Sequence, residues 1–317
     1  DRRQRQMCIR DRDTDRVFIL RTVEDTLRIH KFIAENDVKS AVIAGGGYIG
    51  LEMAENLTEK GISVTIVQRP NQVMAPLDYD MACQLHGLLR KKGITLKFGS
   101  SVTGFEEKDG LILTTLKDDE PLKSDLVILA IGVTPDTALA KDAGLALGIK
   151  GSITVNERME TSAPDVYAVG DAVQVKNFVT GEDALISLAG PANKQGRIAA
   201  DNICGLKSSY DGSQGSSVIK IFDMTAATTG INEKTAKQLG IDYDKVVLFP
   251  LSHAGYYPGA LAMSMKVIYE KKTLRLLGAQ IVGYEGVDKR SDVIATVIRL
   301  GAVSYTHLRA HETDSYL

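Results

Sequence analysis

The sequence predicts an α/β fold in which a parallel sheet is followed by a separate α+β region. Three observations carry this prediction. Apolar strand-like runs alternate with amphipathic helical segments over residues 17–68, and a glycine-rich turn at 45–50 joins one such strand to a helix. Residues 216–303 then change character, because short alternating strands dominate and one helical segment closes the region.

Composition narrows the classes of protein that the chain can be. It has 317 residues, a formal net charge of -2 and 44% hydrophobic residues, which suits two or three domains with real cores. A charge near zero gives no reason to expect nucleic acid or an acidic membrane surface as partner. No apolar run reaches about 18 residues, so we expect no membrane span. Cys8, Cys83 and Cys204 fit neither a disulfide framework nor CxxC metal spacing, and a reducing cytoplasm is expected.

The two ends of the chain differ from the rest. Residues 1–12 are basic and residues 304–317 are polar, and neither segment has a helical or strand period. Both resemble translated sequencing-adapter read-through, so we expect them to be non-native. His307 and His311 have the i,i+4 spacing of a metal pair, but no third ligand stands nearby, and we expect no metal site.

The first elements build a βαβ pattern. A short strand at 17–20 precedes an amphipathic helix from Thr22 to Glu35. Its apolar residues are expected on one face: Val23, Leu27, Ile29 and Ile33. A buried strand at 40–45 then enters the turn Gly-Gly-Gly-Tyr-Ile-Gly, a second helix follows, and a strand at 62–68 completes the unit.

The glycines of this turn have the spacing of a dinucleotide-binding fingerprint. Gly45 is expected to permit the tight turn, Gly47 to let the backbone approach a pyrophosphate, and Gly50 to allow close helix–strand packing. The helix that follows offers its N–H groups and the positive end of its dipole to phosphates. Since the turn follows a strand and opens a helix, the sequence predicts a dinucleotide site here.

The tip of the strand at 62–68 departs from the commonest pattern. An acidic residue there would hold the adenosine-ribose hydroxyls of NAD, but this sequence has Gln68 and Arg69. Two interpretations stay open. The tip is simply solvated, or it accepts a nucleotide that carries a 2′-phosphate.

The chain continues with a helix at 79–92 and short strands at 94–98, 101–107, 111–116 and 125–131. The Asp109-Gly110 turn favours a small antiparallel meander within this domain. Residues 161–172 are then expected to form an apolar strand that ends in Gly170-Asp171. Downstream, a Gly-Pro pair is expected to lead into a helix at Ala192, whose N-terminus would face a ligand. An aspartate at a strand tip followed by such a helix suits a bound flavin dinucleotide.

Four segments in this order carry a family resemblance: GGGYIGLEMAE, LAIGVTPDT, TSAPDVYAVGDA and LAGPANKQGRIAADNI. From about Val17 to Val303 the chain resembles the pyridine-nucleotide–disulfide oxidoreductases. Within them it is most similar to coenzyme A disulfide reductases and their NADH oxidase and persulfide reductase relatives. The resemblance implies a Rossmann-like NAD(P)-binding domain inserted in a partial FAD-binding domain, followed by an α+β dimerisation domain. The expected boundaries are 13–36 and 134–215 for the FAD domain, 37–133 for the NAD(P) domain and 216–303 for the dimerisation domain.

The resemblance also implies roles for individual residues. Tyr48 would gate the flavin face and Glu52 would meet the nicotinamide amide, although Tyr48 could be a packed aromatic and Glu52 a solvated carboxylate. The remaining implied cofactor contacts are the nicotinamide pocket residues Gly132 and Val133, the flavin-binding pair Gly170 and Asp171, and the ring-edge residues Leu188, Ala189 and Ala192.

The last third resembles the interface domain of that family. Its final helix is expected over Gly286–Arg299, with Val287, Ile294 and Val297 buried. Tyr256 and Tyr257 could approach a thiol substrate across a homodimer, but interface packing is the simpler interpretation.

The resemblance implies an enzyme that uses FAD and NAD(P)H to reduce coenzyme A disulfide, a persulfide or a polysulfide. The family's redox cysteine has no counterpart in this sequence, so we expect a fragment that is inactive alone. Two alternatives remain. One is an NADH oxidase that reduces dioxygen, and the other is a non-catalytic nucleotide-binding or electron-transfer partner.

Overall fold

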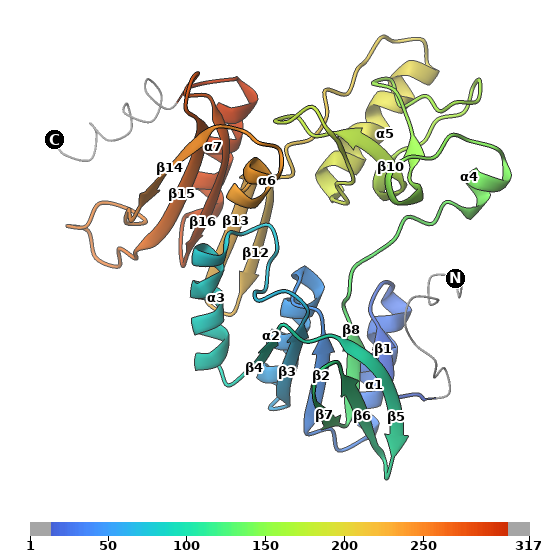
Figure 1. Ribbon diagram of the computed structural model, residues 1–317, viewed down its shortest axis with the longest axis vertical. Helices are drawn as coiled ribbons and strands as arrows, with labels where there is room; N and C mark the ends of the chain where they lie inside the picture. Colours follow the sequence, from blue (N-terminus) through green and yellow to red (C-terminus); the bar gives the residue numbers. More distant parts are fainter. Residues whose placement is uncertain (1–13, 304–317) are drawn as a thin grey trace. The chain divides into compact units, whose positions relative to one another are not determined.

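The computed structural model describes residues 14–303 (Figure 1). The interpretations of residues 1–12 and 304–317, including His307 and His311, lie outside this range. The chain divides into two compact units. The first runs to Gly132 and includes Ile219–Met224, and the second holds the remainder. No helix within residues 14–303 combines the length and the apolar character needed to cross a bilayer.

The first unit is built on a five-stranded parallel sheet (Figure 1). Neighbouring strands pair in parallel throughout, and the central strand is almost completely buried. In spatial order the strands are β1 (Val17–Ile19), β8 (Leu126–Leu129), β2 (Ser40–Ala44), β3 (Ser63–Gln68) and β4 (Thr95–Phe98). A parallel sheet needs helical crossovers, which here are α1 (Val23–Glu35), α2 (Tyr48–Glu59) and α3 (Tyr79–Lys91). The predicted α/β class is confirmed.

An antiparallel meander belongs to the same unit, as the Asp109-Gly110 turn predicts. Both turn residues have positive φ, at 53° and 76°, which suits a tight hairpin. The strands are β5 (Val102–Lys108), β6 (Leu111–Leu116) and β7 (Asp119–Ser124). Phe105 and Ile112 pack with Val42 and Val127 of the parallel sheet, so the meander shares that sheet's core.

The predicted apolar face of α1 is only half right. Val23 and Leu27 are 71% and 63% exposed, whereas Ile29 is buried. The helix begins with a capping box, in which the Thr22 hydroxyl accepts from the Asp25 N–H and the Asp25 carboxylate accepts from the Thr22 N–H. Its C-terminal half packs on β1, where the Phe32 ring contacts Phe18 at 5.2 Å between centroids.

The second unit begins with a three-stranded sheet in the order β11 (Asp183–Ala184), β10 (Val173–Lys176) and β9 (Ile153–Thr154). A short helix α4 (Ala138–Asp142) precedes it, and the long helix α5 (Ala189–Ile203) follows it. Val173, Val175, Ile198 and Ala199 form the core between β10 and α5.

The strand predicted for residues 161–172 is wrong. Only an isolated bridge between Glu160 and Tyr167 forms there, and Gly170–Ala172 make a single turn of 3₁₀ helix, η3. Asp165 follows a proline and takes a positive φ of 58°, which closes a turn between Ala163 and Val166. A turn at this point breaks the extended backbone that a strand requires.

The start of α5 is also corrected. The helix begins at Ala189 with Leu188 as N-cap, not at Ala192. Gly190 and Pro191 therefore lie inside the first turn, where a missing proline N–H costs nothing. The Ala192 N–H donates to the Leu188 carbonyl at 3.1 Å.

The last part of the described chain centres on a five-stranded sheet. Its spatial order is β12 (Ser217–Ile221), β13 (Met224–Gly230), β16 (Leu276–Gly283), β15 (Met263–Glu270) and β14 (Tyr243–Leu248). Of these strands, β13, β16, β15 and β14 pair antiparallel. The short helix α6 (Glu233–Gln238) follows β13, and α7 (Val287–Arg299) packs on β16. Val287 and Ile294 are buried as predicted, but Ile298 takes the place predicted for Val297, which is only partly buried. The α+β region is confirmed.

A buried ionic cluster ties α6 to this sheet. Lys266 on β15 is 1% exposed and forms an ion pair with Glu233 at the start of α6. Glu233 also contacts Lys245 Nζ at 2.7 Å and accepts from the Tyr243 hydroxyl at 2.7 Å. Burial acts to raise the pKa of Glu233, but the hydrogen bonds from Lys245, Lys266 and Tyr243 outweigh it and lower that pKa to about 2.

Replacing Glu233 tests the importance of this cluster. Glu233→Gln removes the carboxylate that pairs with the buried Lys266 ammonium, so the free energy of unfolding should fall by about 3–5 kcal/mol. Lys245→Gln is the control, because Lys245 is 41% exposed and its loss should cost no more than about 1 kcal/mol. The chain contains no tryptophan, so denaturant unfolding is followed by far-UV circular dichroism. Equal losses in the two variants would contradict the assignment.

The same cluster predicts a pH dependence. The pKa of Glu233 in the folded state, about 2, lies below the ordinary value of 4.5. Its stabilising contribution is therefore complete above pH 4.5 and is lost as the pH falls towards 2. The gap in unfolding free energy between the parent and Glu233→Gln should be constant from pH 7 to 5 and narrow below pH 4.5. A gap that widens as the pH falls would contradict the predicted direction of this pH dependence.

Candidate functional site

The glycine-rich turn between β2 and α2 shows why two of its glycines are required. Gly45 has φ of +115°, and a Cβ there would lie 2.2 Å from the Ala130 carbonyl oxygen. A Cβ on Gly50 would lie 2.0 Å from the Gly45 carbonyl oxygen. No side chain fits at either place, so the turn depends on glycine at both.

Gly47 differs, because a Cβ at this position would meet nothing within 4 Å. The fold itself does not demand glycine here. Gly47 is the N-cap of α2 and supplies no capping side chain, so the positive end of the helix dipole stays uncovered. This open backbone at a helix N-terminus is the kind of surface that a pyrophosphate approaches.

Tyr48 and Glu52 lie beside the turn on the same face of α2, since they are four residues apart. Tyr48 is the first helical residue and is half-buried, whereas Glu52 is exposed on the second turn. The Glu52 backbone carbonyl accepts from Asn56 Nδ2 at 2.8 Å, and the Glu52 residue itself is exposed.

The end of β3 reaches the glycine turn directly. Gln68 is the last residue of the strand, and its Oε1 accepts from the Gly46 N–H at 3.0 Å. Arg69 follows and is exposed, and it makes no ion pair within residues 14–303. The structure therefore places the two predicted selectivity residues next to the predicted phosphate turn.

His86 on α3 was not predicted. It is 2% exposed, and its Nε2 accepts from the Val73 N–H at 3.2 Å. Burial, with a smaller effect of the Arg90 charge, lowers the pKa of His86 to about 4, so the imidazole is neutral. A single histidine on an amphipathic helix carries no spacing signal, and only the fold brings it to the loop after β3.

Gly132 and Val133 follow β8, where the first unit ends and the second begins. Gly132 has φ of +101°, a conformation that favours glycine, and Val133 is 56% exposed. An exposed valine beside an unusual backbone turn is compatible with a contact to a ligand.

In the second unit, η3 is held against α5. The Gly170 N–H donates to Gln195 Oε1 at 2.7 Å, and Gln195 is 1% exposed. Asp171, the residue after Gly170, is exposed. Gln195 was missed from the sequence, because its partner lies 25 residues away and no local pattern marks it.

The N-terminus of α5 is also uncapped by any side chain. Leu188 is the N-cap and Ala189 is exposed at the first position. Ala192, in contrast, uses its N–H within the helix, so it can contribute only its side chain to a site. The positive end of a 15-residue helix is thus presented beside Leu188 and Ala189.

Tyr256 and Tyr257 lie in the loop between β14 and β15. They are 93% and 67% exposed, and the Tyr257 ring meets His253 edge-on at 5.8 Å between centroids. Two exposed aromatic rings on one loop are typical of a surface that packs against another molecule.

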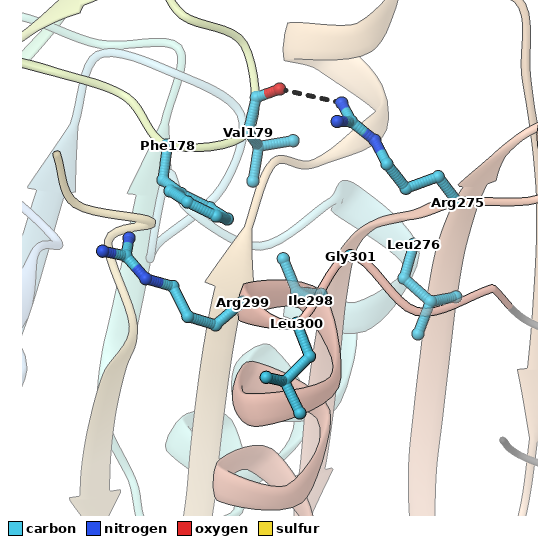
Figure 2. Close-up of a pocket in the computed structure, with 8 residues that line it drawn as sticks. All are labelled: Phe178, Val179, Arg275, Leu276, Ile298, Arg299, Leu300 and Gly301. Carbon is cyan, nitrogen blue, oxygen red and sulfur yellow. Dashed lines mark hydrogen bonds between the residues drawn. The ribbon is translucent and has the colours of Figure 1, made fainter. Parts of the chain in front are cut away.

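A cavity of about 240 Å³ lies elsewhere in the second unit (Figure 2). Figure 2 shows the Arg275 guanidinium bound to the Val179 carbonyl, and this contact measures 3.2 Å. The Arg299 guanidinium lies 4.0 Å from the centroid of the Phe178 ring. These cations hold the wall together, and none of the predicted site residues lines the cavity.

Comparison with known proteins agrees with this geometry. Residues 3–196 match the pyridine nucleotide-disulphide oxidoreductase family, and residues 216–310 match its dimerisation domain. An NADH oxidase of Methanocaldococcus jannaschii is 37% identical over 92% of this chain and 64% of its own length. A coenzyme A disulfide reductase of Staphylococcus haemolyticus is 33% identical over 89% of this chain and 63% of its own. The chain thus spans just under two thirds of these curated relatives.

Solved structures show the same likeness. The reduced Bacillus anthracis CoADR-RHD is 48% identical with a TM-score of 0.88, covering 91% of this chain and 52% of that one. An NAD-dependent persulfide reductase from A. fulgidus is 36% identical with a TM-score of 0.89, covering 92% and 54%. The predicted cofactors, FAD and NAD(P)H, are those of the family. With its glycine-rich turn, its parallel sheet and its antiparallel C-terminal sheet, the chain belongs to the pyridine nucleotide-disulphide oxidoreductases.

Proposed function

We propose that this chain is the greater part of an FAD-dependent NAD(P)H oxidoreductase that reduces coenzyme A disulfide or a related persulfide or polysulfide. The observation that carries the proposal is the turn at Gly45, Gly47 and Gly50. Two of these glycines are required by the fold, and the third is open to a ligand. The names of the relatives, coenzyme A disulfide reductase and persulfide reductase, support the substrate class.

The first unit would bind the nicotinamide nucleotide. The α2 N-terminus at Gly47 would receive the pyrophosphate, and Gln68 and Arg69 would meet the adenosine ribose. Tyr48 and Glu52 on one face of α2 would border the nicotinamide, with Gly132 and Val133 along its pocket. Binding there would orient the ring and keep water away from it.

The second unit would hold the flavin. Asp171, fixed by the Gly170–Gln195 hydrogen bond, would accept hydrogen bonds from the ribityl and phosphate side. Leu188, Ala189 and Ala192 would border the pyrimidine edge of the ring, where the α5 N-terminus favours negative charge. When bound, FAD supplies the two-electron redox chemistry between nicotinamide and disulfide.

The redox thiol is proposed to lie in a part of the parent protein that precedes this sequence. Cys83 is exposed on α3 and Cys204 is exposed at the end of α5, and neither is among the residues proposed to bind cofactors. Residues 216–303 would form a homodimer, with Tyr256 and Tyr257 either packed in its interface or reaching towards the thiol substrate of the partner. A reducing cytoplasm suits such thiol chemistry.

Dioxygen is the second candidate acceptor, because the relative from Methanocaldococcus jannaschii is named an NADH oxidase. The parent protein with its preceding segment separates the two. Flavin bleaching by NAD(P)H followed by thiol release from coenzyme A disulfide supports the proposal. Rapid oxygen consumption without disulfide turnover supports the oxidase, and no bleaching by either nucleotide contradicts both.

A matched pair of glycine variants tests the nucleotide turn. Gly47→Ala should change the free energy of unfolding by no more than about 1 kcal/mol, because its methyl group meets no protein atom. It should nevertheless weaken nucleotide binding about tenfold or more, by keeping the pyrophosphate from the helix N–H groups. Gly45→Ala should instead destabilise the fold by about 1–3 kcal/mol or more. Calorimetric titration with NADP⁺ and thermal melts measure both, and a Gly47→Ala chain that binds like the parent would exclude this site.

The tip of β3 predicts the choice of nucleotide. Arg69 is exposed beside the turn and makes no ion pair with the described part of the chain, so we expect NADPH to bind at least comparably to NADH. Arg69→Ala should weaken NADPH binding by about 1.5–3 kcal/mol, or roughly tenfold to a hundredfold, and barely change NADH binding. A solved engineered NADPH oxidase, 27% identical, has substitutions that remove an aspartate and add arginines, in line with this chemistry.

Gln68→Glu is the complementary variant. Its carboxylate can still accept from the Gly46 N–H and would repel a 2′-phosphate, so preference should move towards NADH. Dissociation constants for both nucleotides decide the matter. If the unsubstituted chain binds NADH more than about a hundredfold more tightly than NADPH, Arg69 points into solvent.

A further inference from the structure

The loop that carries Arg69 is unusually well buried for a connection between a strand and a helix. It spans residues 69–77, between β3 and α3, and is called the strand-end loop below. Val73 is 0% exposed, and Met74 and Leu77 are 1% exposed. Loops generally run over the surface, so a loop that buries three large side chains has a fixed position.

The strand-end loop and the glycine turn hold each other in place. The Met74 N–H donates to the Gly46 carbonyl at 2.8 Å, and the Gly46 N–H donates to Gln68 Oε1 at 3.0 Å. A Cβ on Gly46 would lie 2.8 Å from Val73 Cγ1, so the two segments touch closely. Any shift of the loop would therefore move the turn that is proposed to bind the pyrophosphate.

The loop is also conformationally strained. Met74 has φ of +52°, in the left-handed region that an unbranched non-glycine residue seldom adopts. Gln72 Nε2 donates to the Leu77 carbonyl at 2.8 Å, and the Pro70 carbonyl accepts from the Gly99 N–H at 3.2 Å. Such a conformation persists only where surrounding contacts determine it.

One of these contacts comes from a side chain outside the loop and the turn. His86 on α3 accepts the buried Val73 N–H at 3.2 Å through Nε2. Its ring is flanked by Phe98 at 4.7 Å and by Tyr79 at 6.0 Å between centroids, which sets its orientation. Without His86 the Val73 N–H would be buried and unpaired, and the loop would have to move to pair it.

We propose that His86 is a positioning residue for nicotinamide-nucleotide binding. By accepting the Val73 N–H it holds the strand-end loop against Gly46, and so presents Arg69 to the 2′-phosphate end of the nucleotide. This inference rests on the proposed function of the glycine turn. His86 itself touches no nucleotide, and it acts through the backbone between Arg69 and Met74.

The experiment measures nucleotide affinity in the full chain by calorimetric titration with NADP⁺ and with NAD⁺. His86→Phe keeps an aromatic ring between Phe98 and Tyr79 but removes the acceptor, and His86→Met removes it with a flexible side chain. Either should weaken NADP⁺ binding about five- to tenfold and NAD⁺ binding less. His86→Gln retains an acceptor and should recover most of the affinity. Lys91→Ala, an exposed position on the same helix, is the control and should bind like the parent.

A double-variant cycle separates positioning from general weakening of the fold. If His86 acts through Arg69, then His86→Phe should barely lower NADP⁺ affinity further in an Arg69→Ala background. Titrations are carried out well below the melting temperature of each variant. A purely structural role would lower the melting temperature and leave the dissociation constants unchanged.

The outcomes distinguish the two proposals. If the unsubstituted chain binds neither nucleotide, the proposed function is overturned and this inference with it. Suppose that NADP⁺ affinity falls in Arg69→Ala but is unchanged in His86→Phe or His86→Met, whichever of the two folds. That result overturns only this inference. Loss with both acceptor-free variants, recovery with His86→Gln and coupling to Arg69 support it.

Discussion

The first unit depends on how closely the backbone of Gly45 approaches that of Ala130. A side chain at Gly45 would overlap the Ala130 carbonyl, and one at Gly50 would overlap the Gly45 carbonyl. The Gly45 N–H also donates to the Val67 carbonyl at 2.9 Å, so β2, β3 and β8 converge on one turn. The start of α2, the end of β3 and the entry to Gly132 are all set by this convergence. Residues far apart in the sequence are thereby brought to one edge of the parallel sheet.

Much of this edge could be predicted from the sequence, because its signals are local. The glycine turn, the whole βαβ unit and the residues Gln68 and Arg69 all lie within about 30 residues, from Ser40 to Arg69. The start of α5 was harder to locate. A proline is tolerated throughout the first helical turn, so the Gly190-Pro191 pair could not show whether the helix begins before it or after it. The turn at Asp165 was hidden for a related reason, since the apolar residues around it also suit a strand.

Other features could not be predicted, because their partners are distant in the sequence. Gln195 meets Gly170 and His86 meets Val73 only after α5 and α3 have packed. The apolar residues of α1 illustrate the converse. Val23 and Leu27 have the periodicity of a buried face, but packing on β1 uses only the half of the helix that contains Ile29 and Phe32. Periodicity indicates which residues could be buried, whereas the tertiary partner decides which of them are.

The buried Lys266–Glu233 pair has a consequence for how the C-terminal sheet assembles. Side chains alternate between the two faces of a strand, so a slip of β15 by one residue would move Lys266 to the opposite face. There it would lie away from α6 and its ammonium would lose Glu233, while the neighbouring apolar residues could exchange faces at much smaller cost. The apolar side chains of β15 favour its pairing with the neighbouring strands, and the charge of Lys266 specifies the register of that pairing. Lys266 thus fixes the register of the sheet, in which it pairs with Val247 on one neighbouring strand and with Gln280 on the other.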